Sequence, residues 1–361
     1  MKRLTVNFDE RPCYDIVIDR DFAALKDSFD FRGHRVMIVT DENVKKAVLP
    51  LLLSELPFET EVFSFAPGEG SKNLDTVKEL YRVLIEKHFT RSDVILALGG
   101  GVTGDLAAFA ASTYLRGISC VQVPTSLLSM VDSSIGGKTG VDFDEYKNMI
   151  GAFYMPKLVY INTSVLDTLP DREYFNGFAE VMKHGLIKSE SFYRFLLDNM
   201  YEICEKDPGI LSEMIEQSLM IKKEVVEQDP LEQGERMLLN FGHTIGHAIE
   251  RFKGFELLHG ECVALGAVAA AHISYQKGLL SMDEFYEIRD MFVPFCLPIS
   301  TEFLDYEKIL ENVRSDKKMD GKTLRFVLLK RVGKAVISTD VTDEEIRKAL
   351  DEINFDEKWE D

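Results

Sequence analysis

The stretch Val94–Asp105, VILALGGGVTGD, contains the pattern that decides the fold. Five apolar residues predict a short buried strand, and the alanine-rich sequence that follows predicts a helix. Glycines between a strand and a helix leave backbone N–H groups free to hold a phosphate, and the helix dipole assists them. Gly99, Gly101 and Gly104 have the spacing G-x-G-x-x-G of dinucleotide-binding turns. The turn therefore indicates either a pyrophosphate site or a plain tight turn.

Apolar and amphipathic runs alternate before this stretch. Strands are predicted at His34–Asp41 and Glu61–Ala66, and helices at Asn43–Leu56 and Leu74–Lys87. Strands that alternate with helices of this length imply right-handed crossovers and a largely parallel sheet. The sequence thus predicts an α/β, Rossmann-like N-terminal domain.

The pattern changes to long helical stretches after Pro170. Only Leu324–Lys330 and Lys334–Ser338 have the character of strands late in the chain. We place the boundary near residues 165–172, between an α/β domain at 1–168 and an all-helical or mainly helical domain at 169–361. The predicted helices are Glu173–Ile187, Phe192–Asn199, Pro208–Glu227, Met237–Arg251, Glu261–Lys277 and Asp283–Met291.

The second domain contains an unusual concentration of histidines. His243, His247 and His259 are three of only seven in the chain, and Glu250 lies near them. Histidines four residues apart project from one face of a helix, where a cation or an anionic ligand can meet both. The alternative is a pair of solvated or core histidines. A metalloenzyme is the first hypothesis from the spacing.

Other polar positions have two readings each. Glu69 and Lys72 follow a predicted strand and either reach a cofactor or belong to a capped turn. Glu180 and Lys183 lie three apart among apolar neighbours, where a buried carboxylate needs a partner such as a metal. Gly136-Gly137-Lys138-Thr139 resembles a Walker A loop, but the first glycine of that motif would be Asp132, which disfavours an ATPase.

Composition excludes several classes of function. The net charge of −19 over 361 residues argues against nucleic acid and anionic membrane as partners, although a local basic pocket for a small anion is compatible with it. The N-terminus lacks the apolar core of a signal peptide, and no run is long enough to span a membrane. We therefore expect a soluble cytoplasmic protein with reduced thiols at its five scattered cysteines, which are Cys13, Cys120, Cys204, Cys262 and Cys296.

Six motifs, taken together and in order, resemble the 3-dehydroquinate synthase family of sugar-phosphate cyclases. They are GGGVTGDLAAFAASTYLRG, VQVPTSLLSMVDSSIGGKTGVD, KNMIGAFYMP, GFAEVMKHG, LNFGHTIGHAIE and LHGECVALG. The resemblance covers nearly the whole chain and is strongest from about residue 93 to 275. It implies a free-standing enzyme with an N-terminal NAD-binding domain and a helical metal- and substrate-binding domain.

The resemblance also implies the site residues. The metal ligands fall on Glu180, His243 and His259, with Zn²⁺ as the usual ion and Co²⁺ as a possible one, whereas His247 faces the substrate. The NAD contacts fall on Glu69, Lys72, Gly100, Gly101, Val102, Asp105, Thr125, Ser126, Leu128, Asp132, Lys147 and Thr168. The contacts to an anionic sugar phosphate fall on Asp132, Lys138, Asn148, Lys183, Lys222, Arg236, Asn240, His247, Lys318 as one of two neighbouring lysines, and Arg116, which the family supplies across a homodimer interface.

Two positions depart from the family pattern. Ser126 stands where a second threonine is frequent and keeps the hydroxyl, and Val165 occupies a site where some members place an aromatic residue near the cofactor.

The implied reaction converts 3-deoxy-D-arabino-heptulosonate 7-phosphate to 3-dehydroquinate and phosphate. It comprises transient oxidation at C5 by NAD⁺, β-elimination of phosphate, reduction, ring opening and intramolecular aldol closure. Basic side chains are needed because the substrate carries a carboxylate and a phosphate. The alternatives are another sugar-phosphate cyclase, a glycerol-dehydrogenase-like polyol oxidoreductase, or a catalytically silent NAD- or metal-binding regulator.

Overall fold

The strand expected at Val94–Leu98 forms β5 (Val94–Gly99) in the computed structural model of the chain. The structure describes residues 1–144, 146–254, 256–320 and 324–355, and in helix α13 (Tyr306–Asp320) it describes side chains only as far as residue 314. The chain divides into two compact units. The first comprises residues 1–174 and 206–231, and the second comprises 175–205 and 232–361.

The first unit contains a seven-stranded sheet in the order β1-β2-β9-β6-β5-β3-β4. All neighbouring strands are parallel except β1 and β2. Every residue of β5 is buried, as expected for a parallel strand with helices on both faces of the sheet. The other strands are β1 (Lys2–Phe8), β2 (Arg11–Asp19), β3 (Val36–Asp41), β4 (Thr60–Phe65), β6 (Ser119–Pro124) and β9 (Leu158–Asn162).

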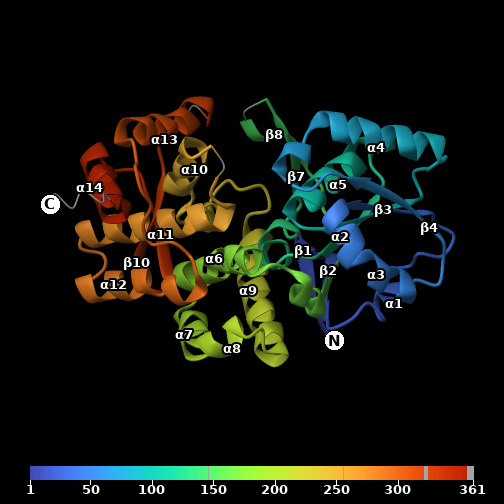
Figure 1. Ribbon diagram of the computed structural model, residues 1–361, viewed down its shortest axis with the longest axis horizontal. Helices are drawn as coiled ribbons and strands as arrows, with labels where there is room; N and C mark the ends of the chain where they lie inside the picture. Colours follow the sequence, from blue (N-terminus) through green and yellow to red (C-terminus); the bar gives the residue numbers. More distant parts are fainter. Residues whose placement is uncertain (145, 255, 321–323, 356–361) are drawn as a thin grey trace. The chain divides into compact units, whose positions relative to one another are not determined.

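The connections after β3 and β5 run in opposite directions along the sheet: β3 leads to the edge strand β4 (Figure 1), and β5 leads to β6. Helices α2 (Glu42–Ala47) and α3 (Leu49–Glu55) lead from β3 to the edge strand β4, whereas α5 (Gly101–Thr113) leads from β5 to β6 on the other side. With right-handed crossovers, α5 and α4 (Leu74–Glu86) cover one face and α2 and α3 cover the other. Open α/β sheets bind ligands where the connections separate in this way, which here is beside the glycine-rich turn.

The single helix predicted at Asn43–Leu56 is two helices. Val48 ends α2, and Pro50 lies in the first turn of α3. Proline has no backbone N–H to continue the hydrogen-bond ladder, but it is well accommodated in a first turn. The unit also contains the short helix α1 (Leu25–Ser28) and a hairpin of β7 (Lys138–Phe143) and β8 (Tyr146–Phe153). Its other elements are three 3₁₀-helices, η1 (Glu69–Ser71), η2 (Tyr114–Arg116) and η4 (Thr163–Thr168), and the π-helical turn η3 (Ser129–Ser133).

Helix α9 (Pro208–Gln228) belongs to the first unit, although the sequence analysis placed it in the second domain. It packs against β1, β2, η3 and η4 through a buried apolar face that includes Leu219 and Val226. The carboxylate of Glu227 accepts hydrogen bonds from the backbone N–H and the side-chain amide of Asn7, at 2.6 and 2.8 Å. The single boundary at 168/169 is therefore replaced by three crossings, at 174/175, 205/206 and 231/232.

The second unit is built around α11 (His259–Gln276), which packs against α10 (His243–Phe252), α12 (Met282–Asp290), α14 (Asp343–Ile353) and β10 (Phe326–Arg331). Almost all of α11 is buried, which explains why its sequence is apolar on every side. The two late strands predicted from sequence form a hairpin of β10 and β11 (Lys334–Ser338). The remaining elements are α6 (Asp171–Lys188), whose first turn belongs to the first unit, α7 (Glu190–Asp198), α8 (Met200–Cys204), η5 (Glu235–Asn240) and η6 (Val293–Phe295).

The helix predicted at Met237–Arg251 is interrupted in the structure. Residues Glu235–Asn240 form η5, and α10 begins only at His243, after Gly242 with a φ of 81°. A left-handed residue cannot continue a right-handed helix, so the two segments take different directions.

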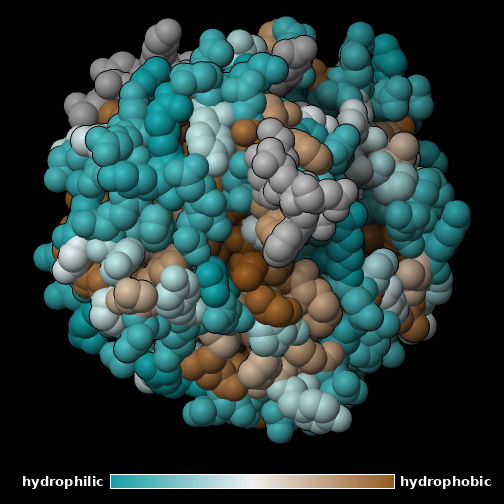
Figure 2. Space-filling model, turned by 60° about the vertical axis from the view of Figure 1, so that its left-hand side comes forward, coloured by the Kyte–Doolittle hydropathy of each residue, from teal (hydrophilic) through white to brown (hydrophobic). Residues whose placement is uncertain are grey.

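Figure 2 shows a face dominated by polar residues, with smaller apolar areas between them. Within the described residues, no helix is both long enough and apolar enough to cross a membrane.

Candidate functional site

Helix α6 presents a buried charged pair in the second unit. Glu180 and Lys183 lie one turn apart and are 0% and 2% exposed, among apolar residues such as Phe178 and Met182. The Lys183 ammonium forms an ion pair with Oε2 of Glu180. A buried carboxylate needs a partner, and Lys183 is the partner of one of its two oxygens.

Two histidines approach the other oxygen of Glu180. Nε2 of His243, at the start of α10, and Nε2 of His259, at the start of α11, each lie 3.4 Å from Oε1. The backbone N–H of Gly260 donates to Oδ1 of Asn176 at 2.5 Å, one turn before Glu180 on α6. This bond attaches the start of α11 to α6 beside the carboxylate.

The three groups influence one another's protonation. Burial raises the pKa of Glu180, but the charge of Lys183 and the two imidazoles outweigh it and hold that pKa well below its usual range. Burial, followed by the charge of Lys183, lowers the pKa of His243. Burial also lowers the pKa of His259, but Glu180 and Glu250 outweigh it, so the net pKa of His259 is raised. These shifts favour an anionic Glu180 and a neutral His243, as metal ligation requires, whereas His259 must release a proton to become a ligand.

These residues fit a divalent metal ion. Neither oxygen of Glu180 makes a hydrogen bond of normal geometry within the described part of the chain, although both are buried. Nδ1 of His243 lies 3.1 Å from the carbonyl of Phe241, which leaves Nε2 to face Glu180. A buried carboxylate with one oxygen facing two imidazoles is a donor set typical of catalytic zinc sites.

The spacing alternative, with His247 as a ligand, also has a geometric basis. One ring nitrogen from each of His243, His247 and His259 lies within 4.8 Å of the others. His247 is exposed, however, whereas Glu180 is completely buried. A buried carboxylate has lost its hydration and therefore needs a cation, whereas an exposed imidazole is still hydrated.

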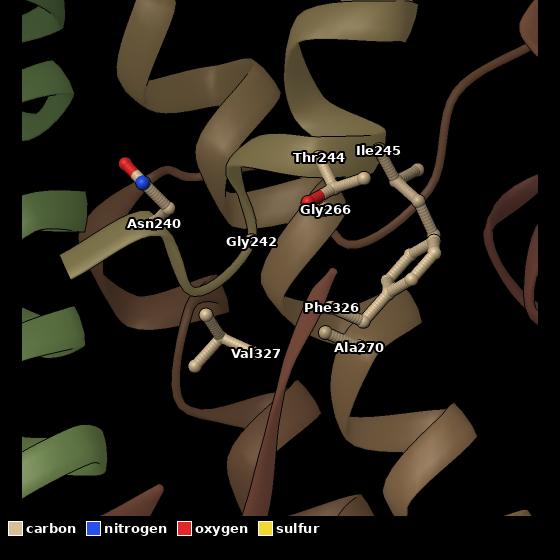
Figure 3. Close-up of a pocket in the computed structure, with 8 residues that line it drawn as sticks. All are labelled: Asn240, Gly242, Thr244, Ile245, Gly266, Ala270, Phe326 and Val327. Atoms are coloured by element: carbon tan, nitrogen blue, oxygen red, sulfur yellow. The ribbon is translucent and has the colours of Figure 1, made fainter. Parts of the chain in front are cut away.

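Arg236 and Asn240 lie on η5, which precedes His243 and helix α10 in the chain. Arg236 is only 2% exposed. The amide of Asn240 donates to Oε1 of Glu232 at 3.0 Å. The hollow beside Asn240, between Gly242, Thr244 and Val327, has no space for a water molecule (Figure 3).

The glycine-rich turn of the first unit has the predicted place between a strand and a helix. Gly100 is the N-cap of α5, so the first N–H groups of that helix lack partners within it. A Cβ at position 99 would lie 2.4 Å from Oγ1 of Thr103, and a Cβ at 104 would lie 2.9 Å from Oε1 of Gln122. These two glycines permit close strand–helix packing, as the dinucleotide fingerprint requires.

A partly buried charged cluster, centred on the buried Lys72, lies beside this turn. Nζ of Lys72 lies 2.7 Å from Oδ2 of Asp105, on α5, and 4.0 Å from Oε1 of Glu69, and Lys147 lies 3.8 Å from the same atom of Glu69. Burial opposes the charge of Lys72, but Asp105 and Glu69 outweigh it and raise the pKa of Lys72. Burial raises the pKa of Asp105 more than Lys72 lowers it. Four predicted NAD contacts therefore come together.

Asn148 joins this cluster, although the resemblance assigned it to the substrate. Its Oδ1 accepts a hydrogen bond from Nζ of Lys72 at 2.5 Å. Asp132, on the π-helical turn η3, pairs with Lys222 of α9 at 2.5 Å. That pair unites residues 90 positions apart and depends on the return of α9 to the first unit.

The remaining predicted contacts of the first unit are more dispersed. Thr125 and Ser126 follow β6, where the N–H of Thr125 donates to the carbonyl of Gly99 at 2.9 Å. The hydroxyl of Thr168 donates to the carbonyl of Val165 at the end of η4. Val102 and Gly101 lie in the first turn of α5, and Leu128 is the N-cap of η3.

Three basic candidates complete the set. Lys138 is the exposed first residue of β7, and Arg116 is an exposed residue of η2 with a φ of 66°. The side chain of Lys318 is outside the described residues.

Two glutamates of this site were not assigned a role from the sequence, namely Glu232 and Glu250. Glu232 holds the Asn240 amide, and Oε1 of Glu250 lies 3.9 Å from Nδ1 of His259. The available signal for Glu250 was a glutamate three residues after His247, next to the apolar Ala248 and Ile249.

A nucleotide-binding type of α/β sheet, together with a helical unit that surrounds a buried carboxylate with imidazoles, defines a class of cofactor-assisted enzymes. Comparison with known proteins identifies the member of that class. The chain belongs to the 3-dehydroquinate synthase family: its N-terminal family model matches residues 62–176 and its C-terminal family model matches residues 177–319.

Individual relatives agree with this assignment. A 3-dehydroquinate synthase from Ruminiclostridium cellulolyticum is 43% identical over 97% of this chain and 99% of its own length. The solved structure of 2-epi-5-epi-valiolone synthase from Streptomyces hygroscopicus subsp. jinggangensis, with NAD⁺ and Zn²⁺ bound, has a TM-score of 0.89 at 28% identity and covers 96% of this chain and 98% of that one. A 2-deoxy-scyllo-inosose synthase, complexed with carbaglucose-6-phosphate, NAD⁺ and Co²⁺, has a TM-score of 0.87 at 25% identity and covers 97% and 99%.

Proposed function

We propose that this enzyme is a lyase that converts 3-deoxy-D-arabino-heptulosonate 7-phosphate to 3-dehydroquinate and inorganic phosphate in the shikimate pathway. The observation that carries the proposal is 43% identity to a 3-dehydroquinate synthase over nearly the full length of both chains. The structural neighbours that make a valiolone or an inosose are 28% and 25% identical, which favours the dehydroquinate reaction over the other cyclases.

Glu180, His243 and His259 would hold a divalent metal ion, with Zn²⁺ as the first candidate and Co²⁺ as the second. Such an ion, when bound, polarises the substrate hydroxyl that is oxidised. Glu180 supplies the anionic ligand, and Lys183 keeps it ionised. The carbonyl of Phe241 keeps the His243 ring in the orientation in which Nε2 faces Glu180.

NAD⁺ would bind the first unit at the start of α5. Bound NAD⁺ supplies the oxidation at C5 and its later reversal, so it is regenerated in each cycle. The free N–H groups after Gly100 favour a pyrophosphate, and the Lys72–Asp105 pair fixes the side chains beside them. Lys147 and Glu69 extend the same cluster.

Basic side chains would bind the substrate's carboxylate and phosphate. Lys183 and Arg236 are almost fully buried in the second unit, and His247 is exposed next to the metal candidates. Lys222 lies in the first unit, paired with Asp132. Several basic side chains among the predicted substrate contacts of a protein of net charge −19 suit an anionic ligand better than an uncharged polyol.

We also propose that the enzyme is a homodimer in which Arg116 reaches the active site of the partner subunit. Rings on the β7–β8 hairpin support this interface, because Phe143, Tyr146 and Phe153 are 46%, 45% and 47% exposed. The hydroxyl of Tyr154, next to the hairpin, donates to the carbonyl of Ile118 at 2.6 Å and so connects it to the Arg116 turn. Aromatic side chains are enriched at the centres of protein interfaces.

The test measures phosphate release from the heptulosonate phosphate with Zn²⁺ and substoichiometric NAD⁺. We expect phosphate and 3-dehydroquinate to form in far greater amounts than the NAD⁺ supplied, without accumulation of NADH. A polyol dehydrogenase would instead produce NADH in proportion to substrate consumed, and a silent regulator would release no phosphate. A hexose 6-phosphate serves as the comparison substrate, and faster phosphate release from it would overturn the assignment in favour of another cyclase.

A further inference from the structure

The two imidazoles that face Glu180 have a common arrangement. Each directs Nε2 to Oε1 of Glu180 at 3.4 Å. In His243, the opposite nitrogen lies against the carbonyl of Phe241. In His259, the opposite nitrogen lies 3.9 Å from Oε1 of Glu250. Each ring is therefore flanked by one acceptor at Nδ1 and the shared carboxylate at Nε2.

Glu250 is placed for this contact by the packing of α10 on α11. It lies in the second turn of α10, seven residues after His243, and it is 4% exposed. Its neighbours Ile249 and Ala248 are also buried against the core of this unit. A carboxylate that is removed from water in this way needs hydrogen-bond donors, and Nδ1 of His259 is within ion-pair distance of it.

We propose that Glu250 is the positioning residue of His259, holding the ring so that Nε2 is available to the metal ion. The proposal rests on the metal site of the proposed function. An imidazole that ligates a cation through Nε2 keeps its single proton on Nδ1, and in His259 that nitrogen faces Glu250. A small rotation of the carboxylate or a bridging water molecule converts the 3.9 Å contact into a hydrogen bond.

Glu261 offers a matched control for Glu250, because it is a second buried glutamate close to His259. Glu261 is also buried, and it lies two residues after His259. Its carboxylate accepts a hydrogen bond from the backbone N–H of Leu258 at 2.8 Å and so caps the start of α11. Glutamine preserves a cap of this kind, so Glu261→Gln removes a nearby negative charge without removing the bond.

The experiment measures Co²⁺ and Zn²⁺ affinity by competition with a chromophoric chelator, together with the Co²⁺ absorption spectrum. We expect Glu250→Gln to bind both ions about 10- to 100-fold more weakly than the unchanged chain and to alter the Co²⁺ spectrum. Glu261→Gln should stay within about twofold of the unchanged chain. If Glu250→Gln also stays within that range, or if both variants lose affinity equally, the positioning role is overturned.

A second measurement requires no variant. In the Zn²⁺-loaded unchanged chain with ¹⁵N-labelled histidine, NMR should place the proton of His259 on Nδ1. A proton on Nε2 would overturn the proposal even if Glu250→Gln did not fold. If the unchanged chain binds neither ion, the metal site of the proposed function fails as well, whereas normal binding with an insensitive Glu250→Gln refutes only the role of Glu250.

Discussion

Glu180 determines the chemistry of the side chains around it, because it is a fully buried anion that faces an ammonium on one side and two imidazoles on the other. This arrangement gives a sharp prediction for metal binding. His243→Ala and His259→Ala should each remove the metal ion, whereas His247→Ala should retain about one ion per chain. Metal analysis after gel filtration measures the difference. The assignment is wrong if His247→Ala empties the site and His259→Ala leaves it occupied.

The Lys72–Asp105 pair gives a prediction for both stability and cofactor binding. Lys72→Met leaves the partly buried carboxylate of Asp105 without its cation and should lower the free energy of unfolding by about 1–3 kcal/mol. NAD⁺ affinity, measured by calorimetric titration, should fall in the same variant. The control is Lys147→Met, whose half-buried pair with Glu69 should change stability by less than about 1 kcal/mol. Equal losses of stability in the two variants would contradict the buried-pair interpretation.

Helix α11 depends on its close attachment to α6 at one point. A Cβ at position 260 would lie 1.9 Å from the backbone oxygen of Asn176, so Gly260→Ala must move the start of α11 away from α6. We expect a loss of about 1–3 kcal/mol in stability and weaker Zn²⁺ binding, because His259 moves with the helix. Denaturant unfolding and Zn²⁺ titration measure these effects. Gly70→Ala, where a Cβ meets no atom within 4 Å, is the control, and a Gly260→Ala variant as stable as that control would refute the argument.

The proposed exchange of Arg116 between subunits concerns the chain as an assembly. Arg116→Ala and His259→Ala should each be inactive alone. When the two are co-expressed, half of the dimers are mixed and each has one complete site, so activity should return to about a quarter of the unchanged level. Light scattering should give twice the mass of the chain. If the mixture remains inactive although mixed dimers form, Arg116 acts within its own subunit.

Much of the architecture follows from local patterns in the sequence. Strands β3, β4 and β5 and the helices around them were predicted because apolar runs and amphipathic runs are directly visible. Strands β1, β2, β6 and β9 were not predicted, because a sheet is completed by long-range pairing such as that of Val17 with Tyr160. The break at Gly242 was missed because its cause is a backbone conformation in an otherwise helical pattern.

The site was predictable to a different extent. Spacing alone paired His243 with His247, and the apolar surroundings of Glu180 marked it as a carboxylate that needs a partner. The family resemblance was needed to combine Glu180 with histidines that begin 63 residues further along the chain. The structure brings Glu180 to His243 and His259 because α6 and α11 are joined through Asn176 and Gly260. It also moves Asn148 to the Lys72 cluster, where a contact across 76 residues leaves no local signal.

The return of α9 to the first unit has a consequence for how such a protein can be rearranged genetically. Because the chain crosses between the units three times, neither unit is encoded by one continuous segment of the gene. A fragment ending at residue 168 would lack the helix that buries Leu219 and Val226 against the sheet and that carries Lys222 to Asp132. Recombination at that point would therefore expose the apolar surface of the first unit that α9 covers, and we expect such a product to aggregate. Because the two units are interleaved in sequence, we expect recombination to preserve them only when it transfers both together.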